Sequence, residues 1–306
     1  MSIPIVIDCD PGHDDAIALL LALASPEVEL RAVTTVAGNQ TLDKTTRNAL
    51  KVLELARRPD VPVAAGAERP LRRELRTAAH VHGETGLDGP SLPEPAARPV
   101  AAHAADLLAE LIGPGVVLVP TGPLTNVALM LERHPDVRGR LERIVWMGGA
   151  AGEGNVTPAA EFNAFVDPEA AAVVFGSGVP VTMVGLDVTH LALFTRDHAE
   201  RLRATGAAGR AVAELSDFFQ RFHERRYGFD GSPIHDALAV AQVIDPTLVA
   251  TQHCNVEVET SSRFCDGRTV VDRLGVTGRP ANAHVGVGVD AGRFLELLVE
   301  RIGRLP

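Results

Sequence analysis

The sequence predicts an α/β protein with a single open, mostly parallel sheet flanked by helices and a helical elaboration toward the C-terminus. Short runs rich in Val and Ile lack polar alternation, as do strands that are buried on both faces. Between these runs, apolar residues recur at helical spacing. Such βαβα alternation is typical of a parallel sheet covered on both faces. No linker or internal repeat divides the chain, so we expect one domain over residues 1–306.

The predicted strands and helices alternate along the first two thirds of the chain. The strands are Ile3–Ile7, Leu30–Val36, Val61–Ala64, Val116–Val119, Ile144–Met147 and Val181–Val184. The helices begin with the apolar run Ala16–Ala24 and continue with Leu42–Ala56, Ala101–Ile112, Leu124–Leu131 and Ala170–Phe175. The proline-rich stretch Ala65–Val100 shows little periodicity, and a loop of that length is usually functional or disordered.

The pattern changes beyond residue 195. We expect, in order, a long helix Ala208–Arg226, a loop Gly228–Ile234, a helix Asp236–Ile244 and short β segments at Val256–Thr260 and Thr269–Val271. We interpret this part as an elaboration of the same domain.

Composition excludes several classes of protein. The 306 residues carry 29 Lys and Arg against 39 Asp and Glu, a net charge of -10. Nucleic-acid binding needs clustered basic residues, so we expect no nucleic-acid partner. No apolar run reaches the roughly 18 residues of a membrane span. The N-terminus has no secretory features, and three cysteines without a CxxC pair indicate reduced thiols and no zinc site. We therefore expect a cytoplasmic protein without membrane partners.

Four acids surround the end of the first predicted strand. Ligands in open α/β sheets bind beyond the carboxyl ends of the strands, and Asp8, Asp10, Asp14 and Asp15 fall at such an end and in the helix that follows. Packed carboxylates repel each other unless a positive charge lies among them. Oxygen ligands without Cys or His favour Ca²⁺ or Mg²⁺. The alternative is that Asp14 and Asp15 only complement a helix dipole, while the other two acids point apart.

Three further polar segments follow predicted turns. They are His235-Asp236, Glu161-Phe162-Asn163 and the loop His80–Asp88. Alone, each fits a helix start or a surface turn. Together with the acids, these amides, carboxylates and histidines are the groups that a polyhydroxylated ligand requires.

Nearly the whole chain resembles, in order, the inosine/uridine-preferring nucleoside hydrolases, which are metal-dependent N-ribohydrolases. The motifs are Asp8-Cys9-Asp10-Pro11-Gly12-His13-Asp14-Asp15-Ala16, Val36-Ala37-Gly38-Asn39-Gln40-Thr41, Pro120-Thr121-Gly122-Pro123-Leu124-Thr125-Asn126, Met147-Gly148-Gly149, Ala160-Glu161-Phe162-Asn163, Asp167-Pro168-Glu169-Ala170-Ala171, Met183–Thr189 and His235-Asp236.

The resemblance implies a role for each matching residue. The Ca²⁺ ligands would be Asp10, Asp15, Asp236 and the backbone carbonyl of Thr121, with Asp8 as a supporting acid. The ribose would contact Asp14, Asn39, Asn155, Glu161, Asn163 and the backbone near Met147. His235 matches the acid that assists the leaving base, and His82 borders the base. Family members form homotetramers or dimers, so the resemblance also implies a homo-oligomer.

The expected reaction is Ca²⁺-dependent hydrolysis of the N-glycosidic bond of ribonucleosides to free base and ribose. Cys9, His13 and the loop from His82 to Pro90 resemble the pyrimidine-preferring branch, which implies uridine and cytidine as substrates, with inosine as a further candidate. We assign the general base to Asp10. Asp14 would stabilise the electron-poor sugar, and Tyr227, Phe222 and Phe229 are candidates to line the base.

Two other functions fit part of the pattern. Asp8-Cys9-Asp10 after a first strand also resembles an aspartyl-nucleophile, Mg²⁺-dependent phosphatase. However, Gly12 stands where that family needs Thr, and no phosphate-binding Lys is evident at a later strand end. A non-catalytic nucleoside- or ribose-binding protein would keep the metal and the pocket but would not need His235.

Overall fold

The computed structural model describes residues 2–306, and its main sheet has nine strands. In chain order they are β1 (Ile3–Cys9), β2 (Val28–Thr35), β3 (Val63–Ala65), β4 (Val117–Pro120), β5 (Arg143–Met147), β6 (Val181–Val184), β9 (Val249–Val258), β10 (Thr269–Asp272) and β11 (Ala283–Val289). Their order across the sheet is β10-β9-β11-β6-β5-β4-β1-β2-β3. All pairs from β11 to β3 are parallel, whereas β9 pairs antiparallel with both β11 and β10. The predicted open, mostly parallel sheet is confirmed.

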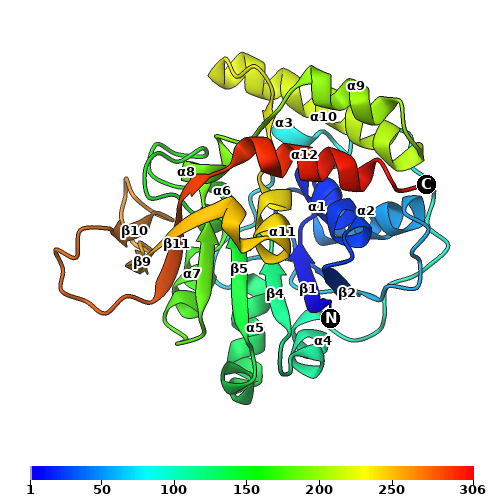
Figure 1. Ribbon diagram of the computed structural model, residues 1–306. Coiled ribbons are helices and arrows are strands. Elements are labelled where there is room, and N and C mark those ends of the chain that lie inside the picture. The colour runs from blue at the N-terminus through cyan, green and yellow to red at the C-terminus, as the bar shows by residue number, and fades with distance from the viewer. Residues whose placement is uncertain (1) are drawn as a thin grey trace.

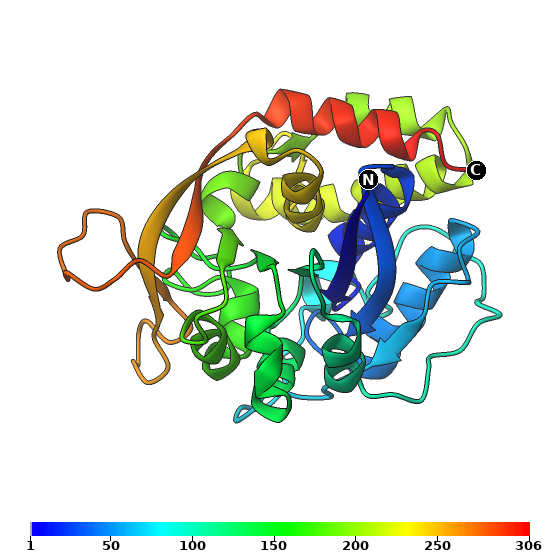
Figure 2. The same cartoon turned by 60° about the horizontal axis from the view of Figure 1, so that its bottom comes forward.

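Helices cover both faces of the sheet (Figures 1 and 2). The first face carries α1 (His13–Ala24), α2 (Leu42–Leu55), α9 (Arg196–Arg203), α10 (Ala207–Tyr227), α11 (Asp236–Ile244) and α12 (Ala291–Ile302). The second carries α4 (Ala104–Leu111), α5 (Thr125–Arg133) and α7 (Pro168–Phe175). Each face of the sheet has its own hydrophobic core, and strand β1 contributes side chains to both. Ile5 and Ile7 pack in the core of the first face, and Val6 packs in the core of the second.

The six strands predicted before residue 195 are present, with ends shifted by two residues or fewer. The β segment predicted at Val256–Thr260 is the end of β9, which begins seven residues earlier, at Val249. The chain after residue 190 was predicted less completely. It begins with the short strand β7 (Leu193–Phe194), which pairs with β8 (Ser232–Pro233) inside the predicted loop Gly228–Ile234. It then returns to the main sheet through β9, β10 and β11, so the C-terminal elaboration is not only helical. The sequence pattern does not predict strand β11, because Gly286 and Gly288 interrupt its apolar run.

The segment between β3 and α4 is mainly irregular and contains one helical turn, α3 (Ala79–His82). Arg73 anchors this segment by hydrogen bonds to Glu169 at 2.8 Å and Asp266 at 2.6 Å. Helix α3 also contacts α10. The long loop therefore has a defined place, close to the carboxyl ends of the strands. No helix between residues 2 and 306 has the length and apolarity to cross a membrane.

Candidate active site

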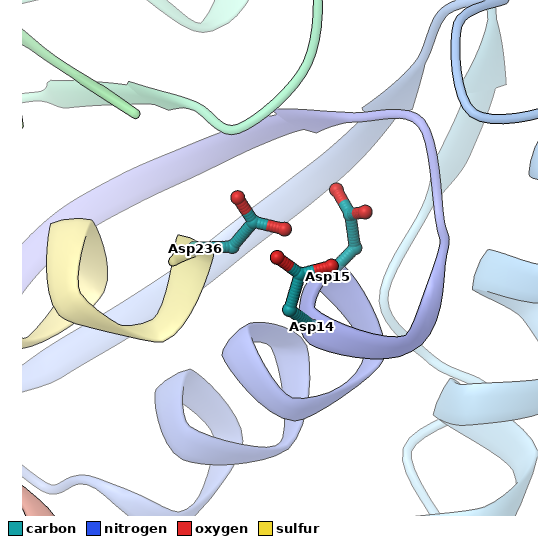
Figure 3. Close-up of side chains that lie close together, drawn as sticks. All are labelled: Asp14, Asp15 and Asp236. Carbon is teal, nitrogen blue, oxygen red and sulfur yellow. The ribbon is translucent and has the colours of Figure 1, made fainter. Parts of the chain in front are cut away.

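The carboxyl edge of the central strands meets the N-terminal ends of two helices that pack on each other, α1 and α11. Asp14 and Asp15 lie in the first turn of α1, and Asp236 is the first residue of α11. Carboxylate oxygens of these three residues lie within 4.8 Å of one another (Figure 3). All three side chains are buried. Acids at a helix N-terminus are favoured by the helix dipole. Three carboxylates this close together nevertheless repel one another unless a cation lies among them.

Asp15 is held by donors from three segments of chain. Its Oδ2 accepts hydrogen bonds from the Gly12 backbone N–H at 2.9 Å and from Asn39 Nδ2 at 3.2 Å. The Gly12 bond is the acid-to-N-cap half of a capping box, which explains why an acid at this position also starts the helix. Its Oδ1 accepts from the Thr121 hydroxyl at 2.8 Å. The orientation of Asp15 is therefore fixed from several sides.

Asp10 lies beside Asp15 in a tightly enclosed position. Its Oδ2 accepts a hydrogen bond from the Asn39 backbone N–H at 2.6 Å. Its Oδ1 is buried and has no hydrogen-bond partner among residues 2–306. Two glycines make room for this carboxylate: a Cβ at Gly38 would lie 2.1 Å from Oδ2, and one at Gly122 would lie 2.6 Å from Oδ1. No larger residue fits at either position without moving Asp10.

These residues fit a hard cation. Burial raises the pKa of Asp10 and Asp236 well above the usual range, and the pKa of Asp14 to about 8, with charge repulsion from Asp15 adding to the last shift. Such shifts mean that the ionised carboxylates lack a positive partner in the protein itself. A cation bound by these oxygens would supply that partner, as would be expected for Ca²⁺ or Mg²⁺.

The other wall of the site begins at the ends of β4 and β5. Glu161 caps α6 (Phe162–Val166) by accepting from the backbone N–H of Asn163 at 2.9 Å, and its other oxygen accepts from the Gly149 N–H at 2.7 Å. Burial outweighs these bonds and raises the pKa of Glu161 to about 7. Asn163 Nδ2 donates to the backbone carbonyls of Thr121, at 2.8 Å, and Met147, at 3.0 Å. A carbonyl oxygen has two lone pairs, so Thr121 keeps one for a cation.

These walls line a pocket at the carboxyl edge of the sheet, where open α/β folds bind small molecules. One end is polar and includes Asp14, Asn39, Asn155 and Glu161. The other end is formed by aromatic rings and imidazoles. No Lys or Arg lines the pocket within the described chain. A polar end beside an aromatic end suits a ligand that joins a hydroxylated part to a flat ring.

Two predicted histidines reach the aromatic end. The ring of His235 lies with Nδ1 2.8 Å from the Thr189 hydroxyl of α8 (Leu186–Thr189). His82, at the end of α3, lies with Nδ1 3.1 Å from Nδ1 of His13. Burial, together with neighbouring imidazoles, lowers the pKa of both His82 and His235 well below the usual range. Both rings are therefore neutral near pH 7.

The structure brings the predicted site residues together. Those predicted to contact the ribose or the ion line the pocket, except the fully buried acids Asp8, Asp10 and Asp15. One difference concerns Asp14: the resemblance assigns it to the ribose, yet its oxygens group with those of Asp15 and Asp236. Of the aromatic residues proposed to line the base, Tyr227 and Phe222 do so, and Phe229 stacks behind Tyr227 instead, with ring centroids 5.3 Å apart.

Several pocket residues had no predicted role of their own: Ala78, His80, Val81, Val156, Phe162, His190, Phe219 and His223. Of these, His80, Val81 and Phe162 lie in segments that the sequence indicated. A signal for some of them was present. Phe219, Phe222, His223 and Tyr227 fall on one face of α10, at the spacing of successive helical turns. Helical periodicity around the candidate Tyr227 would have found this face.

The fold and the site together define a nucleoside hydrolase, and the chain belongs to the inosine-uridine preferring nucleoside hydrolase family, whose sequence model matches residues 5–296. It is 56% identical to the pyrimidine-specific ribonucleoside hydrolase RihA of Shewanella sp. (strain ANA-3), over 99% of this chain and 96% of that protein. It is 53% identical to the enzyme of the same name from Salmonella schwarzengrund (strain CVM19633), over 99% of both chains.

A solved structure with the same fold is that of a purine-preferring ribonucleoside hydrolase from Gardnerella vaginalis. It superimposes with a TM-score of 0.93 at 35% identity, covering 99% of this chain and 98% of that one. This chain is thus similar to relatives that are named for different bases. The fold alone does not set base preference. Family membership removes the phosphatase and binding-only alternatives.

Proposed function

We propose that this enzyme hydrolyses pyrimidine ribonucleosides, uridine and cytidine, in a Ca²⁺-dependent reaction, with inosine as a slower substrate. The observation that carries the proposal is the group of buried carboxylates beneath a pocket whose opposite end is aromatic. The greater identity to relatives named as pyrimidine-specific than to the purine-preferring one supports the base preference.

The proposed ion would be held by Asp10, Asp15, Asp236 and the carbonyl of Thr121, with Asp14 close enough to share it. When bound, Ca²⁺ would supply the positive charge that these acids lack and would orient a vicinal diol and a water. Ca²⁺ takes six to eight oxygen ligands, so these protein oxygens would leave positions for the diol and the water.

The residues of the chain supply the remaining chemistry. Asp10 Oδ1, which has no hydrogen-bond partner within residues 2–306, is the proposed general base that takes a proton from the attacking water. Cleavage of an N-glycosidic bond builds positive charge on the sugar. Asp14 and Glu161 would bind ribose hydroxyls and favour that charge electrostatically. Asn39, Asn155 and Asn163 would fix the sugar by hydrogen bonds.

The leaving base would be assisted by neutral imidazoles. If the Thr189 hydroxyl donates to His235 Nδ1, the ring proton lies on Nε2, which can donate a hydrogen bond to the departing base. His82 and Tyr227 would share the contact with the base.

The test is a reducing-sugar assay over uridine, cytidine, inosine, adenosine and guanosine with metal-stripped protein. We expect activity only after Ca²⁺ is added, and higher kcat/KM for the two pyrimidines. A control with excess Mg²⁺ and a calcium-selective chelator separates the two ions. Equal rates on purines would contradict the base preference, and undiminished activity in chelator would contradict the metal requirement.

The other expectations from the sequence also stand as parts of this proposal: a single domain, a cytoplasmic location and, from the resemblance, a homo-oligomer. Sedimentation velocity of the purified protein tests the last of these.

A further inference from the structure

Asn126 is a buried asparagine behind the site, in the first turn of α5. Its side chain makes three hydrogen bonds. Nδ2 donates to Asp8 Oδ1 at 2.8 Å and to the Thr35 carbonyl at 2.9 Å, and Oδ1 accepts from the Ala67 N–H at 2.9 Å. Asp8 lies in β1, Thr35 ends β2, and Ala67 follows β3. One amide therefore ties three strand ends together.

The neighbouring chain is shaped around this side chain. A Cβ at Gly66 would lie 2.1 Å from Asn126 Oδ1. The backbone after β3 can therefore come this close to the Asn126 side chain only because residue 66 is glycine. Asp8 is also fully buried, and its Oδ1 accepts a second hydrogen bond from the Thr34 hydroxyl at 2.6 Å. The carboxylate of Asp8 is thus held on one oxygen by two donors.

The contact joins two segments that supply proposed Ca²⁺ ligands. The Asp8 backbone carbonyl accepts from the Thr121 N–H at 2.8 Å, while the Asp8 carboxylate holds Asn126. Asp8 lies two residues before Asp10, and Thr121 begins the short loop that leads into α5, whose second residue is Asn126. The two bonds therefore clamp the Asp10 segment to the Thr121 loop.

We infer that Asn126 is a positioning residue of the proposed calcium site: through Asp8 it fixes the relative placement of Asp10 and the Thr121 carbonyl. This inference rests on the proposed function. Residues behind metal ligands typically change metal affinity by 10–100-fold when mutated.

A second asparagine provides a matched control. Asn282 Oδ1 accepts from the Val256 N–H at 2.8 Å, and its Nδ2 donates to the carbonyls of Val256 and Phe175 at 2.9 and 3.1 Å. Like Asn126, it donates two hydrogen bonds and accepts one from a backbone N–H. However, it stands at the amino end of β11, the opposite edge of the sheet from the site, and contacts no carboxylate.

The experiment is isothermal titration of Ca²⁺ into metal-stripped wild type, Asn126→Ala and Asn282→Ala, at a temperature where thermal melts show each protein folded. We expect 10–100-fold weaker binding for Asn126→Ala and binding within about twofold of wild type for Asn282→Ala, although both lower Tm. Wild-type affinity in Asn126→Ala, or equal losses in the two variants, would overturn the inference. Absence of binding by the wild type would overturn the calcium site itself, and the inference with it.

Thr34→Val keeps the test informative if Asn126→Ala does not fold. It removes the other donor to the same Asp8 oxygen with little change in volume. We expect a severalfold loss of Ca²⁺ affinity, smaller than that of Asn126→Ala, and unchanged affinity would overturn the inference.

Discussion

The backbone N–H of Asn39 donates a 2.6 Å hydrogen bond to Oδ2 of Asp10, while Oδ1 of the same buried carboxylate has no hydrogen-bond partner in the described chain. One oxygen is therefore fixed and the other is available to a cation and a water. Asp8 shows the same pattern, with Oδ1 held by Thr34 and Asn126 and Oδ2 without a partner in the described chain. The assignment of the general base to Asp10 therefore rests on its proposed contact with the ion and the attacking water.

Asp10→Asn should lower kcat on uridine by about 10²–10⁴-fold, because an amide cannot accept the proton of the attacking water. The assay is single-turnover hydrolysis at saturating Ca²⁺. Asp136→Asn, at an exposed residue on the surface, is the control and should retain wild-type rates. A variant at Asp10 with wild-type kcat would remove this residue from the mechanism.

Gly38→Ala should weaken Ca²⁺ binding and activity tenfold or more, because the added methyl would lie 2.1 Å from Asp10 Oδ2 and displace it. Gly113→Ala is a matched control, since nothing lies within 4 Å of a Cβ there. Ca²⁺ affinity measured by calorimetry distinguishes the two. Equal affinities would show that Asp10 is not held in place by this close approach.

2′-Deoxyuridine should be cleaved with a kcat/KM about 10⁴-fold below that of uridine. A site with buried groups that bind a hydroxyl rejects an analogue that lacks it, because those groups then lose their partner. Asp14 and the proposed ion are the groups that would lose it. Comparable kcat/KM for the two nucleosides would refute binding of the 2′-hydroxyl.

His235→Ala should impair inosine hydrolysis more than uridine hydrolysis, because the resemblance links this histidine to the departure of a purine. Thr189→Val removes the hydroxyl that lies 2.8 Å from His235 Nδ1. It should lower the rate of inosine hydrolysis in the same direction as His235→Ala, but by less. His253→Ala, on the exposed face of β9, is the control. Equal losses on both substrates would exclude a base-specific role.

The metal-free protein should become less stable as the pH rises from 6 to 8.5. Burial raises the pKa of Asp8 and Glu161 to about 7, and that of Asp14 to about 8. The folded state therefore binds these protons more tightly than the unfolded chain, and this stabilisation is lost as the pH rises through those values. We expect Tm to fall by a few degrees.

Added Ca²⁺ should remove this fall, because the ion binds the deprotonated acids of the folded state. Glu161→Gln should reduce the pH dependence of Tm in the metal-free protein, since it removes one of the titrating groups. A metal-free Tm that rises over the same range would contradict the raised pKa values.

Much of the site could be predicted because its chemistry is concentrated in short motifs. Asp10 and Asp15 stand in one motif, and Glu161 and Asn163 in another, each after a strand that the apolar pattern reveals. The fold class followed from the same alternation. Strand order and the return of β11 to the sheet depend on long-range pairing, which no local pattern specifies.

Other features depend on burial by distant segments. Nothing in the sequence around His235 reveals that His190, His223 and His82 crowd it and that its ring is neutral. Asn126 stood in a predicted motif, but its partners Asp8, Thr35 and Ala67 come from three other segments. Such roles follow from tertiary contacts alone.

The packing of α1 on α11 brings Asp15, near the start of the chain, to Asp236, far along it. An ion shared by their carboxylates would act as a crosslink between the two helices. Neither helix could then unfold its first turn without releasing the ion. Binding of the ion would therefore make the central core more rigid, and loss of the ion would make it less rigid.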